Sequence, residues 1–415
     1  MFKNVEELIS FIESQKRNER KENLDYFRKL CFLFENPQNK KRLIHIGGTN
    51  GKGSTVSYIQ NILMNAGFNV GTYISPYIIC FNERITYNGK YIPNEDVLRI
   101  GNMIISKYLE LDKEGLRHPS FFEFMTLMAF IYFSEIEDLD YAVIEVGIGG
   151  LLDTTNIIRP IISAVTNVSY DHMNVLGNTL GEIWDNKLGI VKPGIPFFTI
   201  KDGEYLHKAI DKCKSLNSPL TIVDRNDIKN IKIDINYTEF DYKDYDGIKL
   251  KLLGAHQIEN AILAIEICRF LQIRKENIYD GLLNTFWPGR LEVVSKKPLI
   301  IIDGSHNIGG ITALSKFIEA IKDKHRVRLI FAVSANKDKD AMINLLEHYV
   351  DEIIFTHFMY KRSDESINLY NLSHHVNKRI VDDVDEIIAL TKADNDFLNI
   401  YCGSLYFISE IRNKF

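Results

Sequence analysis

The stretch "HIGGTNGKGS", residues 45–54, has the composition of a phosphate-binding loop. Its glycines let backbone N–H groups face an anion, and a lysine adds positive charge for the terminal phosphates. The spacing departs from the common P-loop pattern, because Gly53 separates Lys52 from Ser54 and Ile46 stands where the first glycine belongs. Ser54 suits either a contact with phosphate or Mg²⁺, or a plain helix N-cap. The stretch predicts a phosphate site, with a chance glycine cluster as the alternative.

Three further polar residues follow apolar runs of strand length. Ser75 ends "GTYIS", Glu145 ends "DYAVIE" and His172 follows "AVTNVSYD". Because the carboxyl ends of parallel strands meet at one edge of a sheet, these side chains could hold one Mg²⁺ together with phosphate oxygens. Imidazole is the less usual ligand for this ion. Each residue also has an ordinary interpretation: a turn serine, a solvated carboxylate or a hydrogen-bonded histidine.

The elements that must position these residues alternate between strand and helix. A helix is predicted from Ser54 to Ala66, where apolar residues recur at helical spacing and Gly67 supplies a stop. Apolar runs predict buried strands before and after it: "RLIHIGG", "NVGTYIS", "DYAVIEVG" and "IISAVTNVS". This order indicates a mostly parallel sheet with helices on both faces.

The second part of the chain predicts a separate α/β series. Residues 231–253 alternate in polarity instead, and Asp246-Gly247 within them is a hairpin-turn signal. After "WPGR" come four strand-like runs: "PLIIIDGSHN", "RVRLIFAVSANKDKD", "DEIIFTHF" and "FLNIYCGSLY". We therefore expect an α/β protein with a P-loop-type ATP-binding domain over residues 1–287. A smaller, Rossmann-like α/β domain is expected over residues 288–415.

The composition of the chain limits its expected partners and its expected cellular location. The formal net charge of −5 over 415 residues gives no reason to expect a nucleic-acid or anionic-membrane partner. Five scattered cysteines without a C-x-x-C pair indicate reduced thiols. The first 22 residues have helical periodicity rather than the pattern of a signal peptide. No apolar run approaches the roughly 20 residues of a membrane span. We expect a cytoplasmic protein.

At this point the sequence resembles a known family. "GTNGKGS" is similar to the phosphate loop of the folylpolyglutamate synthase and dihydrofolate synthase family, a branch of the Mur ligase superfamily, in which the extra glycine is normal. Further stretches follow in the family's order along most of the chain: "SPYIICFNERI", "SFFEFMTLMAF", "EVGIGGLLDTTN", "VTNVSYDHMNVLG", "NKLGIVKPG", "GAHQIENA", "WPGRLE", "DGSHN" and "GSLY". So many stretches in order make the resemblance specific.

The resemblance implies ATP-dependent amide ligation. A folate carboxylate attacks the γ-phosphate of ATP to give an acyl phosphate, and the amine of L-glutamate then displaces phosphate. Dihydropteroate is implied as a second acceptor, and Mg²⁺ as the metal. The first domain would bind ATP and the pterin, the second would be the glutamate ligase domain, and the family implies a monomer.

The resemblance also assigns roles to residues of this chain. The phosphate contacts would be Gly51, Lys52, Gly53 and Ser54, and the further ATP contacts Asn260, Arg290 and Asp303. The metal ligands would be Ser75, Glu145, His172 and Lys187, with Lys187 carbamylated. The pterin side would be Phe121, Phe122, Glu123, Leu152, Asp153 and Thr154. Lys52, Lys187 and His306, which would lie near the nucleotide, are the expected catalytic residues.

Several of these assignments have structural alternatives. Ser120 and Glu123 have the spacing of a helix capping box, the adjacent phenylalanines suit a core, and Arg84 suits a structural ion pair as well as a phosphate contact. The chain also departs from the family pattern at Tyr77, Leu151, Asn186, Leu188 and Ile308. The loss of a basic residue at Leu151 bears most on the substrate side.

Three other functions compete with this reading. A Mur-type ligase acting on a cell-wall precursor is disfavoured by the inserted glycine and by "HQIENA". A P-loop ATPase or kinase would turn over ATP without glutamate. A silent nucleotide-binding protein is disfavoured because Lys52, Glu145, His172 and Lys187 are all present.

Overall fold

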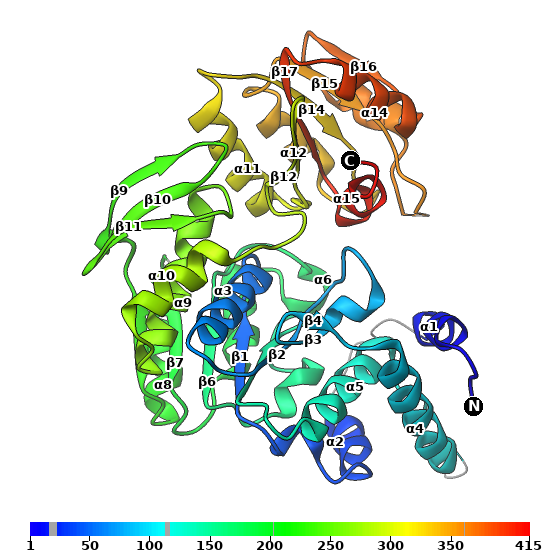
Figure 1. Ribbon diagram of the computed structural model, residues 1–415, viewed down its shortest axis with the longest axis vertical. Coiled ribbons are helices and arrows are strands. Elements are labelled where there is room, and N and C mark those ends of the chain that lie inside the picture. Colours follow the sequence, from blue (N-terminus) through cyan, green and yellow to red (C-terminus); the bar gives the residue numbers. More distant parts are fainter. Residues whose placement is uncertain (16–22, 113–116, 202, 361) are drawn as a thin grey trace. The chain divides into compact units, whose positions relative to one another are not determined.

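The computed structural model describes residues 1–15, 23–112, 117–201, 203–360 and 362–415 (Figure 1). The chain divides into two compact units. The first contains Met1–Arg225 and Asn260–Gly281, and the second contains Asn226–Glu259 and Leu282–Phe415. The sequence-based domain boundary between residues 287 and 288 stays a prediction. In the part of the chain described, no helix has the length and apolar character needed to cross a membrane.

An eight-stranded sheet forms the centre of the first unit, in the order β4-β3-β2-β5-β1-β6-β7-β8. The six strands from β2 to β8 in this order are parallel; β3 pairs antiparallel with β2, and the edge strand β4 pairs antiparallel with β3. The strands are β1 (Leu43–Gly47), β2 (Val70–Tyr73), β3 (Ile85–Tyr87), β4 (Lys90–Tyr91), β5 (Tyr141–Glu145), β6 (Ile162–Val165), β7 (Phe197–Ile200) and β8 (Leu220–Val223). The predicted parallel α/β sheet is confirmed.

Two consecutive residues of β2 show that helices cover both faces of this sheet. The Thr72 hydroxyl lies 2.7 Å from that of Thr86, which also accepts a hydrogen bond from Gln60 of α3 (Lys52–Asn65). The next residue, Tyr73, points the other way, and its hydroxyl lies 3.1 Å from Thr126 of α5 (Phe121–Glu135). Since neighbouring strand residues face opposite sides, α3 and α5 lie on opposite faces.

The remaining helices of this part of the chain follow the alternating order that the sequence predicts. The helix expected from Ser54 to Ala66 is α3, and Gly67 follows it with φ of +88°. The others are α1 (Val5–Ser14), α2 (Asp25–Phe32), α4 (Asn94–Asp112), α6 (Met173–Leu176), α7 (Leu180–Lys187), α8 (Leu206–Ser215), α9 (Ala255–Phe270) and α10 (Lys275–Asn284), with short 3₁₀ turns η1 (Pro37–Asn39), η2 (Phe81–Arg84), η3 (Thr154–Ile157), η4 (Leu188–Ile190) and η5 (Arg225–Asp227).

The second unit begins with a three-stranded antiparallel sheet of β9 (Ile228–Ile233), β10 (Thr238–Tyr242) and β11 (Tyr245–Leu250). The predicted hairpin is present, but its turn was placed wrongly. Tyr242 pairs with Tyr245, so the turn is Lys243-Asp244. Asp246-Gly247 instead forms an irregularity inside β11, and Gly247 donates a hydrogen bond to Asp241. The apolar alternation of the paired strands fixes the register and overrides the turn signal.

A six-stranded sheet completes the second unit, in the order β12-β13-β17-β14-β15-β16. Five strands are parallel, and β12 pairs antiparallel with β13. The strands are β12 (Glu292–Lys296), β13 (Leu299–Ile302), β14 (Arg326–Phe331), β15 (Glu352–Phe355), β16 (Lys378–Ile380) and β17 (Phe397–Cys402); the helices are α11 (Ile308–Ile321), α12 (Lys339–Leu346), α13 (Ser366–Leu372), α14 (Val384–Ala393) and α15 (Leu405–Arg412). The four predicted strands are confirmed. The edge strands β12 and β16 were not predicted.

Candidate active site

The predicted phosphate loop connects β1 to α3. Gly51 has φ of +83°, and a Cβ atom there would lie 2.1 Å from Oδ1 of Asn260. Only glycine fits this position, and Asn260, on α9, packs directly against the loop. The helix begins at Lys52 and its N-cap is Gly51. Ser54 is therefore the third residue of the helix, so the alternative that it is a plain N-cap is wrong.

The strand ends that carry the predicted metal ligands are neighbours in the sheet. β2, β5, β1 and β6 lie side by side in this order. Glu145 is the last residue of β5 and is 4% exposed. Its Oε2 accepts a hydrogen bond of 3.0 Å from the backbone N–H of Ser75, which follows β2. The structure thus brings Ser75 and Glu145 together, as the parallel-strand argument predicts.

His172 lies at the same edge, beyond β6, and is less closely held. It has φ of 49°, and its side chain is 45% exposed, with Nε2 3.9 Å from Oδ1 of Asp171. Among the described residues, no group of three or more His, Cys, Asp or Glu side chains is placed to hold a metal ion. A metal at this edge would therefore need oxygens from Ser75 and from phosphate beside Glu145, which is the ligand pattern of Mg²⁺ bound with a nucleotide.

Lys187 ends α7 and lies beneath the phosphate loop. It is 2% exposed, and its Nζ donates a hydrogen bond of 2.8 Å to the Gly48 carbonyl. Nζ of Lys52 contacts the same carbonyl at 3.3 Å. Burial, followed by the charge of Lys52, lowers the pKa of Lys187 to about 7. A substantial fraction of this amine is therefore neutral at neutral pH, and so it is nucleophilic.

The loop after β5 packs against the end of α7. A Cβ atom at Gly150 would lie 2.8 Å from the carbonyl oxygens of Asn186 and Lys187. Gly150 therefore lets the loop pack closely against the end of the helix that carries Lys187. Leu151, the departure from the family pattern, is 51% exposed.

Asp153 is fixed by its own loop and by the sheet. Its carboxylate accepts hydrogen bonds from the backbone N–H groups of Ile148 and Thr155 and from the Thr155 hydroxyl. That hydroxyl has one proton, so it must accept from His45, whose Nε2 lies 2.8 Å away. His45 is completely buried in β1 and is therefore the neutral tautomer with its proton on Nε2.

This arrangement predicts an acid-sensitive fold. Burial lowers the pKa of His45 from 6.5 to about 3. Between these values the unfolded chain binds a proton that the folded chain excludes, so stability falls as the pH drops below 6.5. From pH 7 to about pH 5 the loss from this residue is about 2 kcal/mol. Urea unfolding of the first unit should show this loss in the parent, and His45→Gln should lack it. Equal pH dependence in both proteins would contradict the assignment.

The predicted pterin-side residues lie at the start of α5. Glu123 is 1% exposed, caps the helix with Ser120 and pairs with Arg117 at 2.7 Å. The capping-box alternative is therefore confirmed, and a contact between Glu123 and substrate stays a prediction. Phe121 is buried beside the guanidinium of Arg84, 5.0 Å from its ring centre.

The other pterin-side residues connect this helix to the loop after β5. The Phe122 ring is half-buried, 5.9 Å from the ring of Tyr73. A Cβ atom at Gly147 would lie 2.5 Å from Phe122, so the loop that ends in Leu152, Asp153 and Thr154 begins against this ring. The structure thus brings the two predicted halves of the substrate side together.

In the second unit, Asp303 follows β13 and holds a tight turn. It is 3% exposed, and its Oδ2 accepts a hydrogen bond of 2.9 Å from the N–H of Leu291, which has φ of 45°. The Gly304 N–H donates to the Gly289 carbonyl at 2.8 Å. Arg290, between these anchored residues, is thus fixed at the carboxyl end of β13 and is half-buried.

His256, which was not predicted as a site residue, interacts electrostatically with Asp303 and Arg290. Burial lowers its pKa; the negative charge of Asp303 opposes this shift and the positive charge of Arg290 adds to it. His306 lies three residues after Asp303, with Nδ1 2.7 Å from the Gly304 carbonyl. A carbonyl oxygen can only accept, so Nδ1 of His306 carries a proton.

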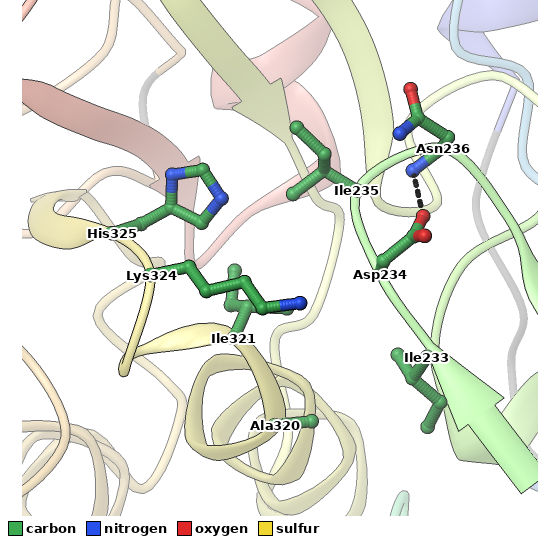
Figure 2. A pocket seen from close by; sticks show the side chains of 8 residues that line it. All are labelled: Ile233, Asp234, Ile235, Asn236, Ala320, Ile321, Lys324 and His325. Atoms are coloured by element: carbon green, nitrogen blue, oxygen red, sulfur yellow. Dashed lines mark hydrogen bonds between the residues drawn. The ribbon is translucent and has the colours of Figure 1, made fainter.

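A pocket elsewhere in the second unit contains none of the predicted site residues. It lies between the β9–β10 turn and the end of α11, where the Lys324 side chain extends toward Asp234 (Figure 2). Asp234 accepts hydrogen bonds from the backbone N–H groups of Asn236 and Tyr237, at 2.6 and 3.0 Å. The carboxylate is thus used by the turn, and we assign this pocket no function.

A glycine-rich loop between a buried parallel strand and a helix, with two lysines on one loop carbonyl, defines a nucleotide-phosphate-binding α/β protein. The sequence model of the Mur ligase middle domain matches residues 46–268, and that of the Mur ligase glutamate ligase domain matches residues 289–405. The chain belongs to the Mur ligase family. It is an ATP-dependent ligase.

Close relatives agree with this family. The chain is 35% identical to the dihydrofolate synthase/folylpolyglutamate synthase of Bacillus subtilis, over 100% of both chains. It is 35% identical to the folylpolyglutamate synthase of Lacticaseibacillus casei, over 83% of each. A solved FPGS–AMPPCP–folate complex superimposes with a TM-score of 0.85 at 30% identity, covering 99% of both chains. The resemblance recognised in the sequence is confirmed.

Proposed function

We propose that this protein joins L-glutamate to the carboxylate of a folate, with release of ADP and phosphate. The relatives are named for this reaction, and the observation that carries it to this chain is the arrangement beneath the phosphate loop. Lys187 is buried there beside Lys52, with its pKa lowered to about 7. A plain ATPase has no need of a buried, partly neutral amine at this place. Dihydropteroate is proposed as a second acceptor, since the Bacillus subtilis relative is also named dihydrofolate synthase.

The chain's own residues account for the first step. The substrate carboxylate attacks the γ-phosphorus of ATP, the bond to the β-phosphate oxygen breaks, and ADP leaves. Lys52 and the N–H groups at the start of α3 neutralise charge on the phosphates. Arg290, Asp303, His306 and Asn260 are proposed to bind the nucleotide.

The second step forms the amide bond. The glutamate amine attacks the acyl carbon, the bond to the phosphate oxygen breaks, and phosphate and one proton are released. The aromatic side chains of Phe121 and Phe122 and the fixed carboxylate of Asp153 are proposed to hold the pterin end of the substrate. Leu152 and Thr154 flank Asp153 in the same loop and are proposed to line the same site.

Magnesium is proposed to lie at the edge formed by Ser75, Glu145 and His172. Bound there, Mg²⁺ would neutralise phosphate charge. Lys187 is proposed to carry a carbamate, formed when its neutral amine adds to carbon dioxide and loses a proton. This would convert a buried amine into a carboxylate-like ligand. A monomeric state and a cytoplasmic location remain predictions from the sequence.

The reaction class can be tested by measuring ADP release. With ATP and Mg²⁺, we expect release only when both glutamate and a reduced folate are present. Replacing glutamate with hydroxylamine should still release ADP and give a hydroxamate, because hydroxylamine intercepts an acyl phosphate. Using dihydropteroate in place of folate tests the second acceptor. ADP release that is indifferent to glutamate and folate would identify an ATPase instead.

A further inference from the structure

The segment that follows β6 is hydrogen-bonded to both peptide groups that flank Asn50 in the phosphate loop. The Asn50 carbonyl accepts two hydrogen bonds, from the Thr166 hydroxyl at 2.6 Å and from Nδ2 of Asn167 at 2.9 Å. The Asn50 N–H donates to Oδ1 of Asn167 at 3.0 Å. One step earlier in the loop, the Thr49 N–H donates to the Asn167 carbonyl at 2.8 Å. The Asn167 side chain is thus hydrogen-bonded to both the N–H and the carbonyl of Asn50.

These contacts admit a single assignment of donors and acceptors. A backbone N–H can only donate, so the atom of Asn167 that faces it must be the carbonyl oxygen, and the amino group faces the Asn50 carbonyl. The Thr166 hydroxyl lies against a carbonyl, so it donates. Both lone pairs of the Asn50 carbonyl are then occupied. Thr166 is completely buried, and Asn167 is half-buried.

These hydrogen bonds determine the direction in which the Gly51 N–H points. In a planar trans peptide, the Asn50 carbonyl and the Gly51 N–H point in opposite directions. With its carbonyl turned toward Asn167, the peptide directs the Gly51 N–H away from β6. Gly51 has φ of +83°, and a glycine reaches negative φ as easily, so the chain itself resists rotation of this peptide only weakly.

We propose that Thr166 and Asn167 are positioning residues that lock the Asn50–Gly51 peptide with its N–H available to the nucleotide phosphates. Without them, the peptide rotates and presents the Asn50 carbonyl oxygen, which repels phosphate. The proposal rests on this loop being the ATP phosphate site. The proposal gives a role to the side-chain donors Thr166 and Asn167, because a glycine-rich loop does not by itself hold one peptide orientation.

The test is ADP binding by calorimetry, with steady-state kinetics of the same proteins. If the locked orientation becomes a minor population, apparent affinity falls in proportion to that population. We expect Thr166→Ala and Asn167→Ala each to weaken ADP binding about tenfold and to raise the KM for ATP alike, with the KM for folate unchanged. Thr166→Ser retains the hydroxyl and should restore binding to within about twofold of the parent.

A matched control separates the lock from the loss of any buried hydroxyl. Ser315 of α11 is also buried, and its hydroxyl donates to the backbone carbonyl of Thr312 at 3.0 Å. Ser315→Ala should leave ADP binding unchanged. Parent-like ADP binding by Thr166→Ala and Asn167→Ala would overturn the lock. If Thr166→Ala does not fold, Asn167→Ala decides, because its side chain is half-buried. Failure of the parent to bind ADP would instead contradict the ligase assignment.

Discussion

Lys187→Ala should lose at least about a hundredfold in turnover while remaining folded, a barrier increase of about 2.7 kcal/mol. The reason lies in the environment of the amine. It is 2% exposed, bonded to the Gly48 carbonyl and close enough to Lys52 for that charge to lower its pKa to about 7. An ordinary lysine at neutral pH would be almost entirely protonated and could not add carbon dioxide.

The proposed carbamate on Lys187 can be tested for directly. Protein equilibrated with ¹³C-bicarbonate should show a carbamate carbon by NMR, and Lys187→Ala should lack it. Short carboxylic acids should partly restore turnover to Lys187→Ala, because they place an oxygen ligand where the carbamate would be.

Lys192 supplies the matched control for this prediction. It is also partly buried with its pKa lowered to about 8, but it donates to the Asn156 carbonyl, away from the phosphate loop. Lys192→Ala should keep both the carbamate signal and turnover. A fully active Lys187→Ala enzyme, or a carbamate signal unaffected by this change, would show that Lys187 has only a structural role.

The position of the phosphate loop and the approach of Ser75 to Glu145 could be predicted, because this information is local or follows from sheet topology. Gly51 and Lys52 are contiguous in the sequence, between a strand and a helix. Ser75 follows β2 and Glu145 ends β5, and parallel pairing brings these strand ends to one edge; the hydrogen bond from the Ser75 N–H to the Glu145 carboxylate confirms this.

Interactions across strands were not predictable in the same way. Nothing in the spacing of Thr166 and Asn167 shows that they bond to Asn50, because that contact depends on β6 lying next to β1. The tautomer of His45 follows from the structure alone, because the Thr155 hydroxyl donates its single proton to Asp153 and must accept from His45. The predicted position of the hairpin turn was wrong because it rested on the local Asp-Gly pair. The true turn is set by the pairing of Tyr242 with Tyr245.

Arg290→Ala should reduce turnover by roughly a hundredfold with little change in stability, on the scale of removing one electrostatic donor from a transition state. The backbone around this residue is fixed on both sides, by the bond from Leu291 to Asp303 and by the bond from Gly304 to Gly289. Such anchoring fixes the backbone from which the Arg290 side chain extends. Its guanidinium has the planar fork that matches the paired oxygens of a polyphosphate.

Two further variants show whether the effect is specific. Arg290→Lys keeps the charge and loses the planar fork, so its turnover should fall between that of the parent and that of Arg290→Ala. Arg99 is a surface arginine, half-exposed and paired with Asp96 and Glu135, and Arg99→Ala should leave turnover unchanged. The measurements are kcat, the KM for ATP and the unfolding midpoint of each variant. Near-normal kcat with a lowered midpoint in Arg290→Ala would show that this arginine holds the turn rather than the nucleotide.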